Sequence, residues 1–281
     1  MNIHNNKYGR AVFIPFFSLL LALAMITAAA CQSGPQGYKS NDEAIKLNEQ
    51  GIEMYSTGQY DRATMYFERA IEADPSNPAV WFNKGQTLDA VRKYEQSIDA
   101  YAQAIQLDSN FADAWSSKAV AYYNLDKQDK ALESVDKAIA LNGNVAKYWS
   151  NKGLILIALE KYGEAVTCFD KATSLDSQVV DYWTNKAYAQ VKSKQYEAVL
   201  VSTDKALSLN ENSALAWGYK AKALHELNRY DEAIIAFDKG LALNPDNPAL
   251  WYSKALTLET LKRTAEAQKC YDKARALGYK F

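Results

Sequence analysis

Few residues of this chain could support catalysis. The sequence contains two histidines, His4 and His225, and three cysteines. A histidine that works as a general acid or base needs an orienting partner within hydrogen-bond reach, and a lone histidine is more often an ordinary surface residue. The sequence contains no glycine-rich phosphate loop and no HExxH or GxSxG pattern. We therefore expect no catalytic residue, no metal ligand, no cofactor and no enzymatic activity.

Cys31 is the cysteine whose surroundings suggest a chemical role. It ends an uncharged run from Ala11, after the basic Lys7 and Arg10, and this order resembles a secretion signal. The last four residues of the run, 28–31, resemble a lipoprotein signal, in which cleavage before the cysteine leaves a thiol that receives a lipid. Two other fates fit the same residues. At ~1.5 Å per residue the run is long enough to span a bilayer, and its alanines also suit cleavage and release.

A strict repeat dominates the rest of the chain. Six tryptophans are spaced by 34 residues without an insertion: Trp81, Trp115, Trp149, Trp183, Trp217 and Trp251. A period of this length is typical of one structural unit that is copied and stacked. When each unit is counted from three residues before its Trp, seven units follow one another from Ala44. Small residues recur at positions 8, 20 and 27, where they allow two helices to pack closely.

The apolar positions inside each unit have helical spacing. Positions 4, 8 and 11 fall on one face of a first helix, and positions 17, 20, 24 and 27 on one face of a second helix. Asn77 and Asn247 each precede a proline, so we expect them to act as N-caps, with proline at the first helical position. The chain is predicted to be all-α, with each unit a helical hairpin.

These residues resemble the tetratricopeptide repeat motif. The sixth unit carries the motif as Trp217, Ala221, Tyr230, Ala233, Phe237, Gly240 and Pro245, with Gly240 in place of the usual alanine. The resemblance implies a right-handed α-solenoid superhelix of seven tandem tetratricopeptide helical hairpins, whose first helices line a concave groove. Grooves of this family commonly bind extended peptides or partner helices. The resemblance implies no particular ligand.

The sequence divides into four predicted parts. Residues 1–31 form a signal peptide or membrane anchor, and residues 32–43, which are rich in glycine, serine and proline, form a flexible tether. The repeats occupy residues 44–277, and residues 278–281 form a C-terminal tail. The predicted repeat boundaries are 44–77, 78–111, 112–145, 146–179, 180–213, 214–247 and 248–277.

The groove-facing positions of the first helices combine amide, hydroxyl, aromatic and aliphatic side chains. A row of such polar groups at one pitch could bind the backbone of an extended peptide, and it resembles the asparagine ladder of the protein O-GlcNAc transferases. Ordinary surface polarity, and packing against the next hairpin, are the alternatives. The predicted binding residues are Phe82, Asn83, Ser117, Tyr123, Asn151, Leu154, Ile157, Asn185, Tyr188, Tyr219 and Tyr252. We expect the apolar centre around Tyr123, Leu154 and Ile157.

The charged residues and the cysteines exclude several kinds of site. The formal net charge is −1 and there is no basic block, so we expect no nucleic-acid partner. A lysine recurs at position 7 from Lys84 to Lys254, and we interpret this row as structural, with acids of the second helices balancing its charge.

Cys168 and Cys270 lie three repeats apart, too far to be bridged, and we interpret them as packing residues.

Two repeats depart from the pattern. In the last repeat, positions 21 and 28 become Gln268 and Arg275, which predicts that stacking stops there. In the fifth repeat, core positions hold Gln190, Ser193 and Thr203. This composition predicts that the weakest interface of the array lies around residues 180–213.

The predicted function follows from these features. We expect a non-catalytic, membrane-anchored scaffold outside the cytoplasm, at the cell surface or in the periplasm, that binds a protein or extended peptide in its groove. One alternative is a pilotin-like assembly lipoprotein for surface or envelope machinery. A second alternative is a regulatory repeat subunit of an enzyme system.

Overall fold

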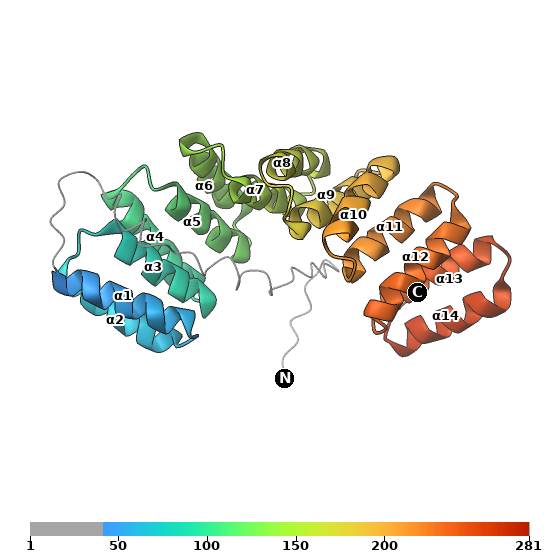
Figure 1. Cartoon of the computed structure of the whole chain (residues 1–281), viewed down its shortest axis with the longest axis horizontal. Coiled ribbons are helices and arrows are strands. Elements are labelled where there is room, and N and C mark those ends of the chain that lie inside the picture. Colours follow the sequence, from blue (N-terminus) through green and yellow to red (C-terminus); the bar gives the residue numbers. More distant parts are fainter. Residues whose placement is uncertain (1–41, 281) are drawn as a thin grey trace. The chain divides into compact units, whose positions relative to one another are not determined.

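The computed structural model describes residues 42–280, and this part of the chain contains fourteen α-helices and no strand (Figure 1). The predicted all-α class and the seven tandem helical hairpins are confirmed. The predicted signal or anchor, Cys31 and most of the tether lie outside the described residues. The helices are α1 (Asp42–Ser56), α2 (Tyr60–Ala73), α3 (Pro78–Ala90), α4 (Tyr94–Leu107), α5 (Ala112–Asn124), α6 (Gln128–Leu141), α7 (Ala146–Ala158), α8 (Tyr162–Leu175), α9 (Val180–Lys192), α10 (Tyr196–Leu209), α11 (Ala214–Glu226), α12 (Tyr230–Leu243), α13 (Pro248–Thr260) and α14 (Thr264–Ala276).

These helices belong to two compact units. Helices α1–α3 lie in the first unit, which ends at Lys93, and helices α4–α14 lie in the second, which begins at Tyr94. Helix α1 begins two residues before the predicted start of the first repeat. Its first turn contains Asp42 and Glu43, and carboxylates are favoured there because the N-terminal end of a helix carries a partial positive charge.

The turn inside each hairpin uses a left-handed residue. In the first hairpin this residue is Gly58, with φ 74°. In the other six hairpins the corresponding residue is not glycine, and φ lies between 58° and 60°: Arg92, Asp126, Glu160, Lys194, Asn228 and Lys262. A residue with a Cβ is strained at positive φ, so each of these six turns lowers the stability of the fold by a small amount.

The turns between hairpins are held by caps and by the tryptophans. Asn77 Oδ1 accepts the amide N–H of Ala79 at 3.0 Å, and Asn247 Oδ1 accepts that of Ala249 at 3.0 Å, so both predicted N-caps are confirmed. Each of the six indole Nε1–H groups donates to the backbone carbonyl six residues earlier, at 2.8–3.1 Å. The half-buried tryptophans therefore tie the first helices of the last six hairpins to the turns that precede them.

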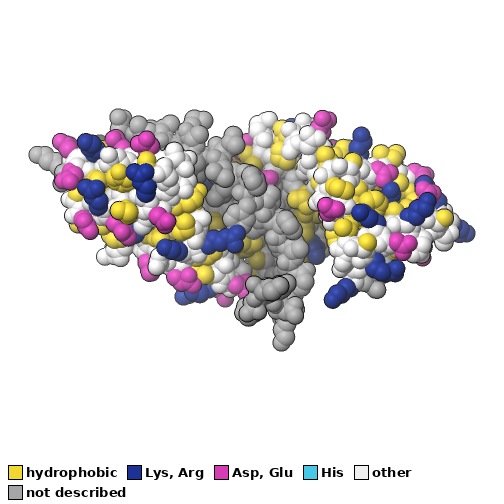
Figure 2. All heavy atoms as spheres, turned by 90° about the horizontal axis from the view of Figure 1, so that it is seen from below, with side chains coloured by type: hydrophobic (Ala, Val, Ile, Leu, Met, Phe, Trp, Pro, Cys, Tyr) yellow, Lys and Arg dark blue, Asp and Glu magenta, His cyan; other side chains and the backbone are white. Residues whose placement is uncertain are grey.

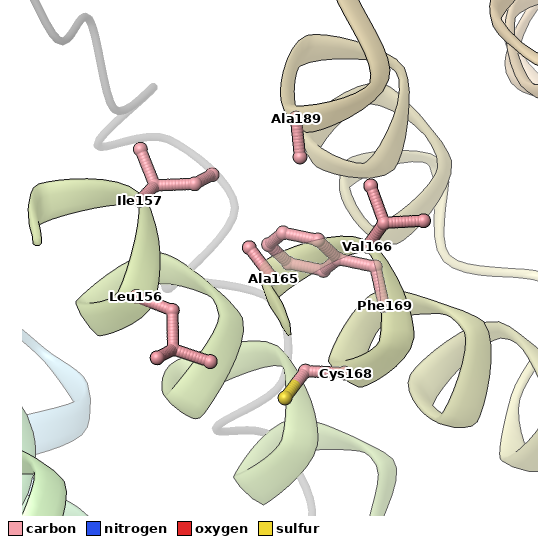
Figure 3. Close-up of a cluster of buried hydrophobic side chains, with 7 residues drawn as sticks. All are labelled: Leu156, Ile157, Ala165, Val166, Cys168, Phe169 and Ala189. Carbon is pink, nitrogen blue, oxygen red and sulfur yellow. The ribbon is translucent and has the colours of Figure 1, made fainter. Parts of the chain in front are cut away.

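The small residues let large side chains fill the space between paired helices. A Cβ added to Gly153 would lie 2.7 Å from the ring of Phe169, and one added to Gly51 would lie 2.5 Å from the ring of Phe67. Figure 3 shows the Phe169 ring among the apolar side chains of α7, α8 and α9, close to Ala165. The close helix packing that the sequence predicts is confirmed at these positions.

The last hairpin differs from the others as predicted. Ile234 and Leu241 at positions 21 and 28 of the sixth repeat are buried, whereas Gln268 and Arg275 in the seventh are exposed. Residue Tyr279 of the predicted tail stacks on Tyr252 of α13, with ring centroids 4.7 Å apart. Between residues 42 and 280, no helix has the length and apolarity that crossing a membrane requires.

Candidate binding surface

Within each unit, the first helices of successive hairpins contact one another. In the second unit α5 contacts α7, α7 contacts α9, α9 contacts α11 and α11 contacts α13, and in the first unit α1 contacts α3. Among the described helices of the second unit, the second helices α4, α6, α8, α10, α12 and α14 make no comparable contact with one another. Because the first helices of the second unit lie closer together than its second helices, their side chains that point away from the hairpin partners form its inner face, and the same name is used for the corresponding side of α1 and α3 in the first unit.

All of the predicted binding residues lie on first helices. Nine of them are half-buried: Phe82, Ser117, Tyr123, Asn151, Leu154, Asn185, Tyr188, Tyr219 and Tyr252. The other two are buried. Asn83 is 8% exposed, and Ile157 is 7% exposed within the core cluster of α7 and α8 (Figure 3). Ile157, predicted at the apolar centre of the groove, therefore offers little surface to a ligand.

Two asparagines of the row connect neighbouring first helices. Asn83 Nδ2 donates to Asn48 Oδ1 at 2.9 Å, and Asn151 Nδ2 donates to Ser116 Oγ at 3.1 Å. In both pairs the partners are 35 residues apart, so the same bond links position 6 of one repeat to position 5 of the repeat before it. These two amides hold the inner face together, and part of their hydrogen-bonding capacity is already used.

The inner face of α9 and α11 carries a different combination. The rings of Tyr188 and Tyr219 lie 5.8 Å apart, and the ammonium of Lys192 lies 5.7 Å from the Tyr188 ring. Burial, followed by the proximity of Tyr188, raises the pKa of the Tyr219 phenol. Asn185 is half-buried one turn before Tyr188 on the same helix. An amide, two aromatic rings and an ammonium thus lie together on the inner face of these two helices.

The lysine row is structural, as predicted. Five of the lysines pair with an acid sixteen residues earlier on the preceding second helix: Lys84 with Glu68, Lys152 with Asp136, Lys186 with Asp170, Lys220 with Asp204 and Lys254 with Asp238. At the corresponding place for Lys118 the chain has Ala102, and burial lowers the pKa of the Lys118 ammonium. The ammonium of Lys118 lies 5.3 Å from the Trp115 ring, a favourable cation–π distance.

A second polar network joins the N-terminal ends of α5 and α7. Asp113 Oδ1 accepts the phenol O–H of Tyr148 at 2.8 Å, and the ammonium of Lys147 lies 2.6 Å from the same oxygen. Burial, followed by the charge and hydrogen bond of Asp113, raises the pKa of Tyr148. Asp113 is therefore already engaged by two groups of the next repeat.

His225 is also engaged in packing rather than fully solvated. Its Nδ1 lies 2.9 Å from Thr257 Oγ1 on the next first helix, and burial lowers its pKa. The Thr257 hydroxyl itself donates to the carbonyl of Ser253, so it accepts a hydrogen from Nδ1–H. This pair links the sixth and seventh repeats and lacks the orienting carboxylate of a general base.

The two cysteines of the repeats are buried in the cores. Cys168 and Cys270 are 4% and 5% exposed, and burial raises the pKa of the Cys168 thiol to about 11. Both are packing residues, as predicted.

Residues 42–280 bring together no group of three or more metal-ligating side chains. Figure 2 shows acidic and basic side chains interspersed over the visible part of one face, which gives no extended field of one sign.

The fold and the inner face define a class of protein, the helical-repeat scaffolds that present a row of side chains on stacked hairpins. Four family models described as tetratricopeptide or TPR repeats match the chain. One model matches residues 47–77, 112–145 and 146–179, and a second matches residues 66–99 and 236–269. A third matches residues 93–126 and a fourth matches residues 214–247. The chain belongs to the tetratricopeptide repeat family. The matched ranges omit residues 180–213, the repeat with the polar core.

Several solved structures have a similar fold. YrrB, described as a TPR protein with an unusual peptide-binding site, is 24% identical, with a TM-score of 0.57, over 64% of this chain and 93% of YrrB. A tetratricopeptide repeat protein from Parabacteroides merdae is 17% identical, with a TM-score of 0.62, over 85% and 94% of the two chains. PilF of Pseudomonas aeruginosa is 16% identical, with a TM-score of 0.65, over 79% and 97%. These similarities show the fold. No curated protein sequence matches the chain significantly.

The structure adds one feature of the inner face that the sequence did not predict. A shallow depression lies between α1 and α3 in the first unit. It is lined by Ile52, Tyr55, Phe67, Asn83 and Gln86. Ile52 and Tyr55 lie three residues apart on α1, on one side of the helix, but the sequence could not show that Phe67 of α2 lies against the same space.

Proposed function

We propose that this protein is a non-catalytic, membrane-anchored scaffold outside the cytoplasm that binds a protein or extended peptide on the inner face of its first helices. The observation that carries this proposal is the grouping of Asn185, Tyr188 and Tyr219 on α9 and α11. Tyrosines provide a large contact area with little loss of conformational entropy, and a carboxamide offers both donors and an acceptor to a peptide backbone.

The distribution of charges supports the same surface. Lysines of the first helices pair with acids of the second helices on the packed sides of the hairpins. The group on the inner face of α9 and α11 is one amide, two aromatic rings and the single ammonium of Lys192, which suits a peptide backbone better than a phosphate chain that needs clustered cations. YrrB, which has a similar fold, is described as having a peptide-binding site, and this description supports a peptide or protein ligand for the present chain.

Photocrosslinking in the native host tests the binding surface. A benzoylphenylalanine in place of Tyr188 lies on the inner face, whereas one in place of Val201, which is 67% exposed on α10, lies on a second helix. We expect a discrete crosslinked partner from position 188 and none from position 201. Crosslinking from position 201 alone would contradict the proposal.

The membrane anchor is proposed from the sequence. Cys31 and the uncharged run before it favour a lipid on the cysteine, while a spanning helix and a cleaved, released form are the alternatives. The intact mass of protein extracted from native membranes tests this part. We expect a chain that begins at Cys31 and carries lipid. An unprocessed chain from Met1 would support a spanning helix, and an unmodified chain found in the soluble fraction would support release.

The pilotin-like alternative keeps the anchor and the repeats but assigns a different partner. The identity of the protein crosslinked at position 188 separates the two possibilities, because an assembly lipoprotein would capture a component of a surface or envelope machine. The regulatory alternative predicts capture of an enzyme at the same position.

A further inference from the structure

We propose that Lys192 recognises a carboxylate of the bound peptide. This inference rests on the proposed peptide-binding function and assigns an acidic ligand to the inner face of α9 and α11. Lys192 ends α9 beside the group formed by Asn185, Tyr188 and Tyr219. In the described part of the chain it makes no ion pair, unlike the five paired lysines of the row at position 7.

Two tyrosine rings position the ammonium of Lys192. It lies 5.7 Å from the centroid of the Tyr188 ring and 6.0 Å from that of Tyr162, the first residue of α8. Both distances allow a cation–π attraction, which restricts a long side chain that is otherwise exposed. The charge is therefore held in place before a ligand binds, and less conformational entropy is lost on binding.

Three side chains of α9 form one stripe along the helix. Asn185, Tyr188 and Lys192 are three and four residues apart, so they lie on the same side of α9. Asn185 is half-buried, and among the described residues its amide has no hydrogen-bond partner, whereas Asn83 and Asn151 donate to the preceding first helix. The stripe thus offers an amide for the peptide backbone and an ammonium for a carboxylate.

The neighbouring charges on α11 already balance each other. The ammonium of Lys222 lies 3.4 Å from Glu226 Oε1, one turn further along the helix. Glu226 also interacts with Tyr196, because burial, followed by the charge and hydrogen bond of Glu226, raises the pKa of that phenol. A cationic side chain of a ligand would meet Lys192 without finding an unpaired acid here. An anionic side chain would gain the ammonium of Lys192.

The single ammonium favours a carboxylate over a phosphate chain. Binding of a nucleic-acid backbone relies on several clustered cations, which this stripe lacks. A carboxylate needs only one ammonium for a short, charge-assisted hydrogen bond. The carboxylate has two possible sources, an aspartate or glutamate side chain and the C-terminus of the peptide, and the test must separate them.

An array of synthetic peptides probed with the full-length protein tests this inference. Pairs of peptides of varied sequence differ only by glutamate or glutamine at one place, and each neutral peptide is made with a free and with an amidated C-terminus. We expect about three- to fivefold more binding to the glutamate member of a pair if the carboxylate is a side chain. The same preference for the free C-terminus would identify a terminal carboxylate. Either preference should fall at ~1 M salt, where the Debye length is ~3 Å.

Three variants make the test specific. Lys192→Gln removes the charge and should abolish the preference. Lys192→Arg keeps a cation that stacks on aromatic rings and should preserve it. Lys171→Gln removes the same charge from an exposed position on the second helix α8 and should also preserve it. Circular dichroism shows whether each variant is folded.

The outcomes separate the role of Lys192 from the general function. Peptides that bind without a preference for a carboxylate, or a preference that survives Lys192→Gln, would overturn the role of Lys192 and leave the proposed function standing. A preference that Lys171→Gln also abolishes would indicate an effect of net charge and would overturn it as well. If no peptide binds above background, the carboxylate site and peptide binding are both rejected.

Discussion

The fourth and fifth hairpins share one backbone design and both contain apolar clusters, but their side chains differ at three core positions. In α7 and α8 the core consists of apolar groups that include Leu156, Cys168 and Phe169. At the equivalent positions α9 and α10 have Gln190, Ser202 and Thr203, which are at most 3% exposed. Ser202 Oγ donates to Gln190 Oε1 at 2.8 Å, and Thr203 Oγ1 donates to the backbone carbonyl of Val199 at 2.9 Å, so each of these side chains has a hydrogen-bond partner. The repeat backbone therefore tolerates polar side chains at core positions when hydrogen bonds satisfy them.

The two cores should contribute differently to stability. Apolar burial gives roughly 25 cal/mol per Å² of surface removed from water, whereas a typical intramolecular hydrogen bond contributes a net ~1 kcal/mol. The fifth hairpin also carries Asn185 and Tyr188 of the proposed binding surface. A less stable hairpin at this place would allow local adjustment around a ligand.

The largest expected effect is the loss of the central aromatic ring of the fourth hairpin. Phe169→Ala should lower the free energy of unfolding by about 3–5 kcal/mol, because Phe169 is fully buried and its removal leaves a cavity. Thr203→Ala, at the same position of the fifth hairpin, should cost no more than about 1 kcal/mol, since it removes a single side-chain hydrogen bond and little volume. Urea unfolding followed by circular dichroism measures both, and equal losses would remove the contrast between the two cores.

Overpacking should produce the next largest effect. Gly153→Ala should lower the free energy of unfolding by about 1–3 kcal/mol, since the new Cβ would lie 2.7 Å from the Phe169 ring. The fifth hairpin already has Ala187 at this position, opposite the smaller Thr203. The double variant Gly153→Ala with Phe169→Val should recover part of the loss, and a Gly153→Ala protein as stable as the parent would show that the ring moves aside freely.

High pH should destabilise the fourth core through its thiol. Burial raises the pKa of Cys168 to about 11 from an ordinary value of 9, so the folded state holds the proton more tightly than the unfolded state. Stability from this group is full below about pH 9 and is lost as pH rises toward about 11. Cys168→Ala is the control, because it removes the pH dependence of stability that this thiol causes and leaves that of the buried tyrosines. The same pH dependence in both proteins would contradict the assignment.

Removing both members of the polar pair should leave the fifth hairpin more stable than removing Gln190 alone. Gln190→Leu alone leaves the Ser202 hydroxyl without its buried partner, whereas Gln190→Leu with Ser202→Ala removes both polar groups. We expect the double variant to be about 1 kcal/mol more stable than the single variant. A double-mutant cycle measured by urea unfolding gives the coupling energy. Purely additive effects would mean that the bond between these two side chains contributes nothing.

The smallest expected effect should be the same in both hairpins, because the backbone is shared. Glu160→Gly and Lys194→Gly should each raise the free energy of unfolding by about 0.5–1 kcal/mol, since both residues have φ 60°. Gly58→Ala, at φ 74°, is the reciprocal control and should lower it. Different gains at residues 160 and 194 would show that the two hairpins also differ in their turns.

The repeat sequence predicted most of the fold. The 34-residue period, the small residues and the Asn–Pro pairs were sufficient for the hairpins and their caps, because each of these signals acts within one repeat or its immediate neighbour. The acids opposite the lysine row were predictable for the same reason. The spacing did not show the hydrogen bonds of Asn83 and Asn151 to the preceding helix, since these depend on the register between adjacent hairpins.

The candidate site was predicted less completely. Sequence position placed Tyr188 and Ile157 on the groove-facing sides of their helices, but only packing distinguishes the half-exposed Tyr188 from the buried Ile157. The depression in the first unit depends on Phe67 entering the space left by Gly51, which is a three-dimensional fit between two helices. A helical period alone cannot show this fit.

Hydrogen exchange on the full-length protein tests the central contrast most directly. Amides of α9 and α10, residues 180–209, should exchange faster than those of α7 and α8, residues 146–175, because the polar core gives the fifth hairpin a lower free energy of local opening. Binding of a partner on the inner face should slow exchange in α9 more than in α7. Residues 180–209 emerging as the best protected part of the array would contradict the account.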